Sequence, residues 1–355
     1  MEQRDDVVVV GAGVVGLATA LALLEDGRGV RVIEARRIGS GSSHGNCGTI
    51  TPSHAPPLAA PGRVGEALRM MLRPDAPLYV RPRVDPRLWR WLWRFAGRCN
   101  LRDWEASARA KSLLLNDSRV RLCEWVGRHG LDCEFAESGE DYVFRSPAAF
   151  ERGQHELDRL RELGVDVEGI DGPAFDAQEP AVLPGTAGAI RFRGDAVLRP
   201  DRYVDELARV VRARGGRIDE ECALQRLDES AAGAALHTSA GVLHAREVVV
   251  AAGAWAPNLA RAIDAPWLAG AMQPGKGYSI TYDPPPLVPR RPLVLRDWSV
   301  CVTSWPSGFR LGSTMEFSGF DARLRPRRLA ALERAARASL REPAGPVVRE
   351  RWRGW

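Results

Sequence analysis

The sequence has few cysteines and no paired cysteine motif. The six are Cys47, Cys99, Cys123, Cys133, Cys222 and Cys301. They form no CxxC pair and no repeated spacing, so the sequence indicates neither a zinc site nor a disulfide framework. We therefore expect no bound metal and a reducing, cytoplasmic location.

Long apolar runs are also absent. No stretch approaches the ~18 consecutive apolar residues of a transmembrane helix, and the N-terminus lacks the basic region and cleavage site of a signal peptide. The 355 residues are 45% hydrophobic and 27% charged, which excludes disordered, collagen-like and disulfide-stapled classes. The length predicts two domains.

Lysine is scarce, and the positive charge is carried by arginine. Lys111 and Lys276 are the two lysines, and the net charge is +5. Residues 323–355 hold ten arginines against three glutamates, a local charge of +7. Such a basic segment could bind phosphate groups or an anionic membrane surface. Because no aromatic-interleaved basic groove accompanies it, we expect no nucleic-acid partner.

The N-terminal segment has the pattern of a dinucleotide-binding βαβ unit. The β-branched run 7–10 predicts a strand buried on both faces. It leads into the glycines of GAGVVG at 11–16, a helix that ends at Gly27 and a strand at 30–34. These glycines allow a tight turn, backbone approach to a pyrophosphate and close helix–sheet packing. The pyrophosphate would lie at the positive helix N-terminus.

An acidic residue narrows the choice of cofactor. Glu34 lies 18 residues after the last glycine of the motif, where such folds bind ribose hydroxyls. It would repel the 2′-phosphate of NADP, although Arg36 and Arg37 follow it. The small polar loop 39–49 favours FAD, because its backbone can lie against a flat ligand. NAD remains the alternative.

The rest of the chain alternates helical and strand-like patterns. Four prolines make 52–62 a loop. Residues 63–135 have a helical pattern, and Ser146-Pro147 caps a further helix. We expect helices after Pro200 and over 327–340, a strand at 248–252 and a β-meander over 276–315.

Several motifs together resemble the D-amino-acid oxidase superfamily, and most closely its bacterial D-amino-acid dehydrogenase branch. Glycine oxidase and monomeric sarcosine oxidase are more distant members. The resemblance extends from residue 5 to the end of the chain. The motifs are GAGVVG with Glu34, GSGSSHGNCG at 39–48, VVVAAGAWA at 248–256, PGKGYS at 274–279, GSTMEFSGFD at 312–321 and the tryptophan-rich PRLWRWLWRF at 86–95.

The resemblance implies an α/β protein in two interleaved parts. A Rossmann-like FAD-binding domain of the glutathione-reductase type would take 1–60, 195–265 and 345–355. An α+β substrate domain with a mixed or antiparallel sheet would take 61–194 and 266–344. The glycine motif and the resemblance together imply FAD contacts at Val10, Gly11, Ala12, Gly13, Val14, Val15, Gly16, Glu34, Ala35, Arg36, Ser42, Ser43, His44, Asn46, Gly48, Leu224, Ala252, Gly253 and Trp255.

Two departures from the family pattern stand out. Gly48 and Thr49 stand where the sarcosine oxidase branch has arginines, so no arginine clamp can be assigned to this loop. The family also continues after a motif like ERWRGW, at 350–355, into a glycine-rich segment. We therefore expect a chain that is C-terminally truncated relative to the family.

The implied reaction is oxidative deamination of D-amino acids, or of a related amine such as hydroxyproline, glycine or sarcosine. Hydride passes from Cα to the flavin, and the imine hydrolyses to a 2-oxo acid and ammonia. The candidate catalytic residues are His44, Lys276 and Tyr278. The alternatives are a loop-shaping histidine, a solvated turn lysine and a core tyrosine.

The partners would be a small amino acid and a quinone or oxygen as electron acceptor. Trp89, Trp91 and Trp93 lie in an arginine-rich helix. They would either pack between domains or bring the enzyme to the inner face of the cytoplasmic membrane. An NAD-dependent dehydrogenase and a non-catalytic flavin-binding remnant or subunit stay open as alternatives.

Overall fold

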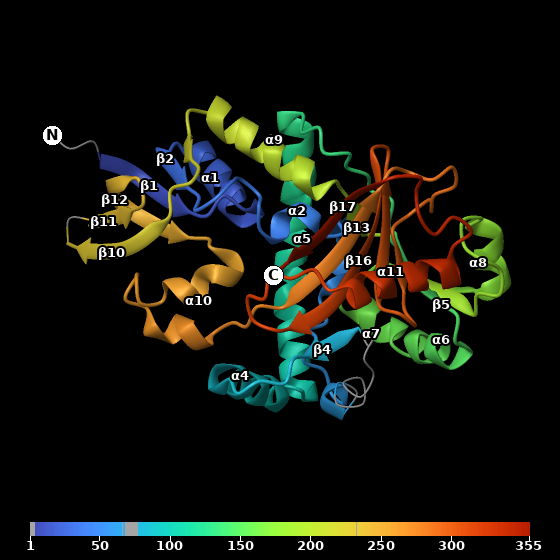
Figure 1. The fold of residues 1–355 in the computed structure, drawn as a ribbon. Helices are drawn as coiled ribbons and strands as arrows, with labels where there is room; N and C mark the ends of the chain where they lie inside the picture. The colour runs from blue at the N-terminus through green and yellow to red at the C-terminus, as the bar shows by residue number, and fades with distance from the viewer. Residues whose placement is uncertain (1–3, 66, 68–76, 232) are drawn as a thin grey trace.

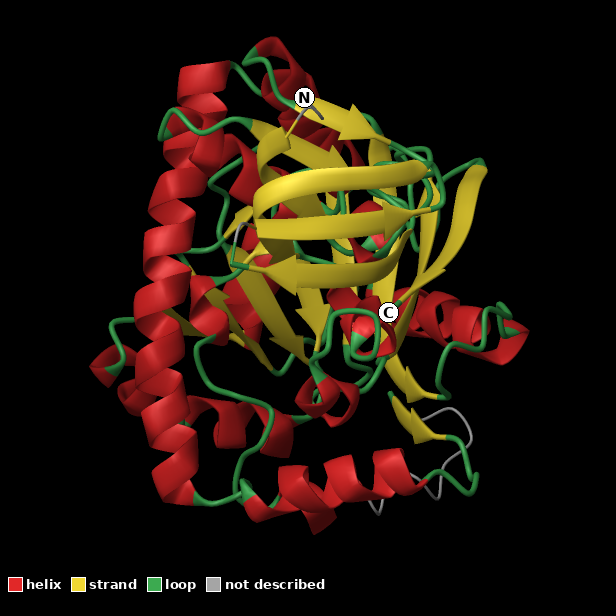
Figure 2. Ribbon diagram, turned by 90° about the vertical axis from the view of Figure 1, so that its left-hand side faces the viewer, coloured by secondary structure: helices red, strands yellow, loops and turns green. Residues whose placement is uncertain are grey.

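Two β-sheets, each covered by helices, lie side by side in the structure (Figure 1). It is a computed structural model that describes residues 4–65, 67, 77–231 and 233–355. The 29-residue helix α5 (Leu101–His129) runs along both sheets, as Figure 2 also shows. The two sheets and the segments that join them define the region in which a site can form.

The first sheet contains the N-terminal strand and has the order β10-β11-β12-β1-β2-β9. Its strands are β1 (Arg4–Val10), β2 (Val30–Ile33), β9 (Arg217–Asp219), β10 (Leu224–Ser230), β11 (Gly233–Thr238) and β12 (Gly241–Val250). Strand β1 pairs in parallel with β2 and β12. Helices α1 (Val14–Glu25) and α9 (Pro200–Ala213) pack against the core on one face of this sheet (Figure 1).

Strand β1 is buried on both of its faces. Val7 and Val9 belong to the cluster that packs against α1 and α9. Val8 and Val10 point the other way and pack with residues of β10, β11 and β12. This alternation follows from the two-residue period of a strand. The prediction of a doubly buried strand at 7–10 is confirmed.

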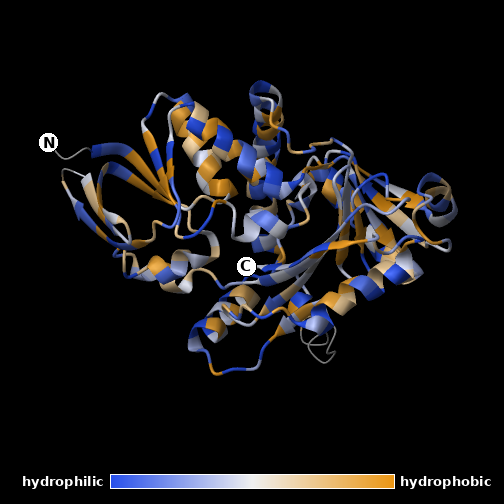
Figure 3. Ribbon diagram, turned by 45° about the horizontal axis from the view of Figure 1, so that its top comes forward, coloured by the Kyte–Doolittle hydropathy of each residue, from blue (hydrophilic) through white to orange (hydrophobic). Residues whose placement is uncertain are grey.

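The second sheet is larger and mixed, with the order β17-β13-β16-β15-β14-β5-β7-β6 and β4 paired to β16. Its strands are β4 (Leu78–Val80), β5 (Glu140–Phe144), β6 (Val167–Asp171), β7 (Gly188–Phe192), β13 (Lys276–Tyr282), β14 (Leu293–Leu295), β15 (Val300–Trp305), β16 (Gly308–Phe317) and β17 (Val348–Gly354). Helix α11 (Pro326–Ser339) packs on its main hydrophobic cluster. Figure 3 shows hydrophobic and hydrophilic residues alternating along the helices and strands of this part.

Short elements connect the two sheets. Strands β3 (Thr49–Ile50) and β8 (Ala196–Val197) pair with each other. The remaining helices are α2 (Ser42–Gly45), α4 (Pro86–Gly97), α6 (Pro147–Gln154), α7 (Leu157–Glu162), α8 (Gly172–Gln178) and α10 (Ala256–Leu259), with the 3₁₀ turns η1 (Pro52–His54), η2 (Gly253–Trp255) and η3 (Pro266–Gly270).

The structure refines the expected elements in two places. The helical region expected over 63–135 contains strand β4, and residues 66 and 68–76 within it lie outside the described part. The helix expected after Ser146 is broken into α6 and α7. The fold class is confirmed: a largely parallel sheet that begins with a glycine turn stands beside a mixed sheet.

The last strand differs from the expected chain division. Residues 345–355 are expected in the FAD-binding part, whereas β17 pairs antiparallel with β13 at the edge of the larger sheet. The C-terminal half of α5, expected in the substrate part, instead packs on the core of the first sheet through Leu122, Trp125 and Val126. Both differences are long-range pairings that no local pattern specifies.

We expect Gly16→Ala to destabilise the protein by about 1–3 kcal/mol or more, because a Cβ at Gly16 would lie 1.8 Å from the Gly11 carbonyl oxygen. Gly127→Ala is the matched control, since it lies in α5 with open space around the added Cβ and should stabilise that helix by about 0.5–1 kcal/mol. Urea unfolding of both variants checks this. Equal effects of the two substitutions would contradict the close-packing argument.

Candidate functional site

The turn after β1 brings backbone amides to the start of helix α1. Gly11 has φ +113°, a conformation that favours glycine. Gly13 is the N-cap of α1, with no side-chain cap and no acidic residue in the first turn. The partial positive charge of the helix N-terminus is therefore not neutralised by the helix itself. An anion such as a pyrophosphate suits this end.

Glu34 lies over the same turn. Its carboxylate accepts hydrogen bonds from the Ala12 amide (2.9 Å) and the Arg36 amide (3.0 Å). Each oxygen keeps further acceptor capacity, because a carboxylate has about four lone-pair positions. This is the arrangement that binding of ribose hydroxyls requires.

Helix α2 and the turn after it lie between α1 and the second sheet. The Ser43 hydroxyl oxygen accepts a hydrogen bond from the Val14 amide at 3.0 Å. Within the turn, the Asn46 side-chain amide donates to the Ser42 carbonyl (3.0 Å), and its oxygen accepts from the Gly48 amide (2.8 Å). The predicted loop residues are therefore ordered next to the glycine turn.

The residues expected after β12 lie on the other side of the turn. The Ala251 carbonyl oxygen would be 2.6 Å from a Cβ at Gly11, so this backbone closely approaches the glycine motif. The Arg36 guanidinium stacks over the Trp255 ring, 4.9 Å from its centroid. Leu224, by contrast, is 8% exposed and packs in the core with Val10 and Ile33.

His44 is paired with the last strand. Its Nε2 lies 3.0 Å from a Glu350 carboxylate oxygen in β17. This hydrogen bond raises the pKa of His44 and, from the other side, lowers the pKa of Glu350. The pair joins α2 to the edge of the second sheet, and sequence reasoning did not foresee this partner.

Lys276 and Tyr278 do not join His44 in one pocket, and the expected grouping needs correction. The Lys276 ammonium donates to the carbonyls of Asp321 and Arg323, each at 2.8 Å. The Tyr278 hydroxyl donates to Glu316 at 2.9 Å. Both side chains are buried, because the strand period turns Tyr278 into the core with Ile280. The buried position of Tyr278 fits the alternative of a core tyrosine. Lys276 is also buried, so the alternative of a solvated turn lysine does not fit it.

A pair of buried carboxyl groups went unnoticed in the sequence. Glu140 in β5 is 1% exposed, and neither of its oxygens has a hydrogen-bond partner among the described residues. Burial raises its pKa, and the charges of Asp195, Cys47 and Asp141 raise it further. Burial also raises the pKa of Asp195 to about 6, although Ser53 donates hydrogen bonds to it.

These acids predict a pH dependence of stability. Their folded-state pKa values lie above the unfolded ones, so the folded protein binds more protons, and stability falls as pH rises above about 4.5. Glu140→Gln stays neutral at every pH, so its melting temperature should fall less between pH 5 and pH 8 than that of the wild type. The control is Glu229→Gln in the exposed strand β10. Parallel curves for the wild type and Glu140→Gln would refute this assignment.

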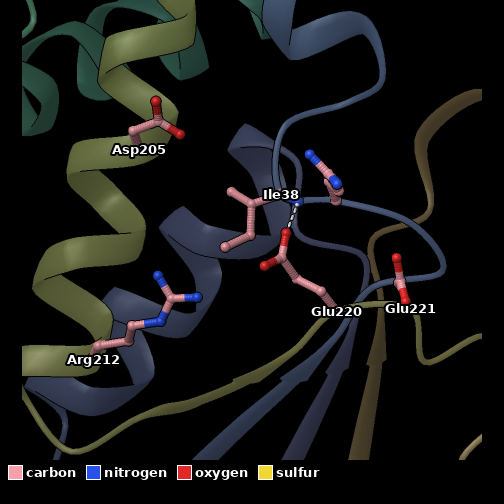
Figure 4. Close-up of a pocket in the computed structure, with 6 residues that line it drawn as sticks. Ile38, Asp205, Arg212, Glu220 and Glu221 are labelled. Atoms are coloured by element: carbon pink, nitrogen blue, oxygen red, sulfur yellow. Dashed lines mark hydrogen bonds between the residues drawn. The ribbon is translucent and has the colours of Figure 1, made fainter.

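One surface pocket lies outside the predicted site (Figure 4). Its volume is about 580 Å³, and its lining residues are Arg37, Ile38, Asp205, Arg212, Glu220 and Glu221. Glu220 accepts a hydrogen bond from the Ile38 amide at 2.7 Å. None of the predicted FAD contacts lines it. No cluster of three or more potential metal-ligating side chains occurs in the described ranges.

The residues present fit a dinucleotide cofactor. The start of α1, the glycine turn before it and the acceptor Glu34 lie together at the end of two parallel strands. At Gly13 a Cβ would meet only the Ser43 hydroxyl, at 3.3 Å, so the backbone is open to a ligand there. Fold and site together define a dinucleotide-binding protein.

Comparison with known proteins specifies the family. Residues 6–355 match the FAD dependent oxidoreductase (DAO) family. A D-amino acid dehydrogenase of Granulibacter bethesdensis is 30% identical over 341 residues, 92% of this chain and 79% of the relative. D-amino acid dehydrogenase 2 of Pseudomonas aeruginosa is 32% identical over 347 residues, 95% of this chain and 80% of the relative.

Solved structures show the same fold. Glycine oxidase from Geobacillus kaustophilus superposes with a TM-score of 0.70 at 20% identity, covering 99% of this chain and 82% of that one. An FAD-bound L-alpha-glycerophosphate oxidase from Mycoplasma pneumoniae has a TM-score of 0.67 at 16% identity, covering 99% and 83%. This chain belongs to the DAO family of FAD-dependent oxidoreductases, and its cofactor is FAD. The NAD alternative is thereby excluded.

Proposed function

We propose that the protein oxidises the amine-bearing carbon of a small D-amino acid. Bound FAD supplies the hydride acceptor, and the resulting imine hydrolyses to a 2-oxo acid and ammonia. The main support is the family match along nearly the whole chain, together with relatives named D-amino acid dehydrogenase at 30–32% identity. Hydroxyproline, glycine and sarcosine are the related amines to be tested beside D-amino acids.

In this proposal the first sheet holds the cofactor. The amides of Gly13, Val15 and Gly16 bind the pyrophosphate, since those of Gly11, Ala12 and Val14 already donate within the protein. Glu34 accepts from the ribose hydroxyls, and residues 42–48 lie along the flavin. The hydrogen bonds of Glu34 and Ser43 support these roles, because they fix the surrounding backbone without using a side chain of the glycine turn. The protein's further task is to orient Cα against the flavin and to exclude water.

The chain division follows the two sheets. We assign residues 1–60 and 195–265 to the FAD-binding part, and 61–194 with 266–344 to the substrate part, except that the C-terminal half of α5 goes with the FAD-binding part, on whose core it packs. Strand β17 is added to the substrate part, because it pairs with β13. His44 remains a candidate for contact with the flavin or the substrate, since its backbone lies in α2 and its imidazole is half-buried.

A visible spectrum of the purified protein tests the function. We expect flavin absorption bands that bleach on anaerobic addition of D-amino acids and stay unchanged with the L-enantiomers. Stopped-flow traces with D-amino acids, hydroxyproline, glycine and sarcosine rank the substrates. Bands that persist with every amine would contradict the proposed reaction, and would favour a flavin-binding chain without amine oxidation.

A peripheral contact with a membrane, where a quinone could accept the electrons, fits helix α4. Trp89 and Trp93 are four residues apart, so they share one face, and their exposures are 55% and 81%. Trp91 instead stacks on Phe95 and contacts Phe317. Exposed Arg87, Arg90 and Arg94 flank the two tryptophans. In the described ranges, no helix is long and apolar enough to cross a bilayer.

The double variant Trp89→Ala/Trp93→Ala should bind anionic vesicles about tenfold more weakly or worse, because it loses two aromatic side chains that would insert at the interface. Co-sedimentation with phosphatidylglycerol-containing vesicles measures this. The control is Leu113→Ala/Leu114→Ala on the exposed side of α5. Unchanged sedimentation of the tryptophan variant would rule out α4 as the contact.

A further inference from the structure

Three buried side chains of the second sheet bond to successive carbonyl groups of residues 44–47, which we call the 44–47 loop. The Ser279 hydroxyl donates to the Gly45 carbonyl at 2.7 Å. The Thr303 hydroxyl donates to the Cys47 carbonyl at 2.9 Å. Arg310 reaches the other two carbonyls, that of Asn46 at 2.7 Å and that of His44 at 3.4 Å.

These three donors come from three neighbouring strands. Ser279 lies on β13, Thr303 on β15 and Arg310 on β16. Each is at most 1% exposed. Arg310 is itself held in place, because its Nε donates to the Thr281 hydroxyl at 2.9 Å and its guanidinium stacks over Trp305. The carbonyls of the loop therefore meet a rigid, preorganised surface.

The direction of the carbonyls decides the direction of the amides. In a trans peptide the N–H of one residue points opposite to the carbonyl of the residue before it. Because the carbonyls of Gly45 and Asn46 point to the sheet, the amides of Asn46 and Cys47 point away from it. The Gly48 amide behaves accordingly, since it bonds to the Asn46 side chain rather than to the sheet.

The amides of Asn46 and Cys47 have no hydrogen-bond acceptor within the part of the chain that the structure describes. Asn46 is exposed, so its surroundings are open to a ligand. On the other side of the segment, the Ser43 hydroxyl of α2 accepts a hydrogen bond from the Val14 amide at the start of α1, where the pyrophosphate would bind. The two amides thus lie on a segment that is bonded to the second sheet on one side and, through Ser43, to helix α1 on the other.

We propose that Ser279, Thr303 and Arg310 are positioning residues, which fix the 44–47 loop so that the amides of Asn46 and Cys47 donate hydrogen bonds to the flavin. This rests on the cofactor placement proposed above. Donors held in place before a ligand binds cost no reorganisation on binding, and they favour negative charge on the group that they face. The substrate sheet would in this way adjust both the affinity for FAD and its reduction potential.

The test uses two small substitutions that leave the buried Arg310 intact. Ser279→Ala and Thr303→Val each remove one hydroxyl and nearly keep the side-chain volume. We expect each to raise the dissociation constant of FAD about fivefold, and the double variant about 25-fold. The double variant should also have weaker flavin circular dichroism and a more negative midpoint potential.

Ser304→Ala is the matched control. Ser304 is the neighbour of Thr303 on β15, but its hydroxyl donates to the Pro289 carbonyl at 3.0 Å, away from the loop. We expect this variant to bind FAD within twofold of the wild type. If the double variant also binds FAD within twofold, with an unchanged spectrum and potential, the proposal is wrong. Equal losses in the control and the double variant would overturn it as well, because they would indicate general destabilisation.

The outcome is separable from that of the proposed function. A wild type that binds FAD but is not reduced by any amine would refute the proposed reaction, while the dissociation constants would still decide the role of the loop. A wild type that binds no FAD would overturn both proposals.

Discussion

The close approach of Gly16 to Gly11 is the contact on which the nucleotide-binding half depends. An added Cβ at Gly16 would lie 1.8 Å from the Gly11 carbonyl, so helix α1 can begin directly at the end of β1 only without a side chain there. That position aligns the helix N-terminus with the end of the parallel strands. It also brings the Ala12 amide to Glu34 and the Val14 amide to Ser43. A phosphate-binding helix end, a ribose acceptor and the flavin-side loop are thus assembled by one backbone contact.

The second sheet forms hydrogen bonds to the nucleotide-binding half in addition to packing beside it. It reaches α2 and its following turn through Ser279, Thr303 and Arg310, and its edge strand β17 adds the pair of Glu350 with His44. Helix α5 contributes a separate tie, since Trp125 donates to Glu25 of α1 at 3.1 Å. Substrate-side and cofactor-side elements are therefore linked by hydrogen bonds as well as by packing. A structural change in the large sheet can therefore be transmitted to the 44–47 loop through these hydrogen bonds.

Two buried glutamates of the large sheet, Glu316 and Glu140, differ in whether cationic side chains surround them. Glu316 is fully buried but surrounded by cations, with Arg325 at 3.1 Å and Lys276 at 3.7 Å, so its desolvation is compensated. Glu140 is equally buried but has no arginine or lysine partner among the described residues. The His54 imidazole lies 3.9 Å from it, but burial lowers the pKa of His54 to about 4, and the neighbouring Asp195 and Asp141 are acidic. A buried carboxyl without a partner is uncommon in native proteins and calls for an explanation in function or ligand binding. Cys47, the last residue of the 44–47 loop, is among the groups that raise the pKa of Glu140, so this protonation-sensitive carboxyl lies close to that loop.

The sequence by itself determined the βαβ start, because each glycine and Glu34 has a local geometric reason that pattern and spacing express. It also determined where some helices begin, because N-cap side chains such as those of Ser146 and Asp85 accept hydrogen bonds from backbone amides of the first turn. Tertiary structure decided the rest of the site. Lys276 and Tyr278 lie against Glu316, and β17 pairs with the edge of the large sheet. Glu140 lies near Asp195, which is 55 positions away in the sequence. These outcomes depend on which face of a strand meets which neighbour, and a shift of one residue reverses that face. Local sequence patterns determine backbone conformation, whereas contacts between side chains that are distant in the sequence form only when the sheets pack together.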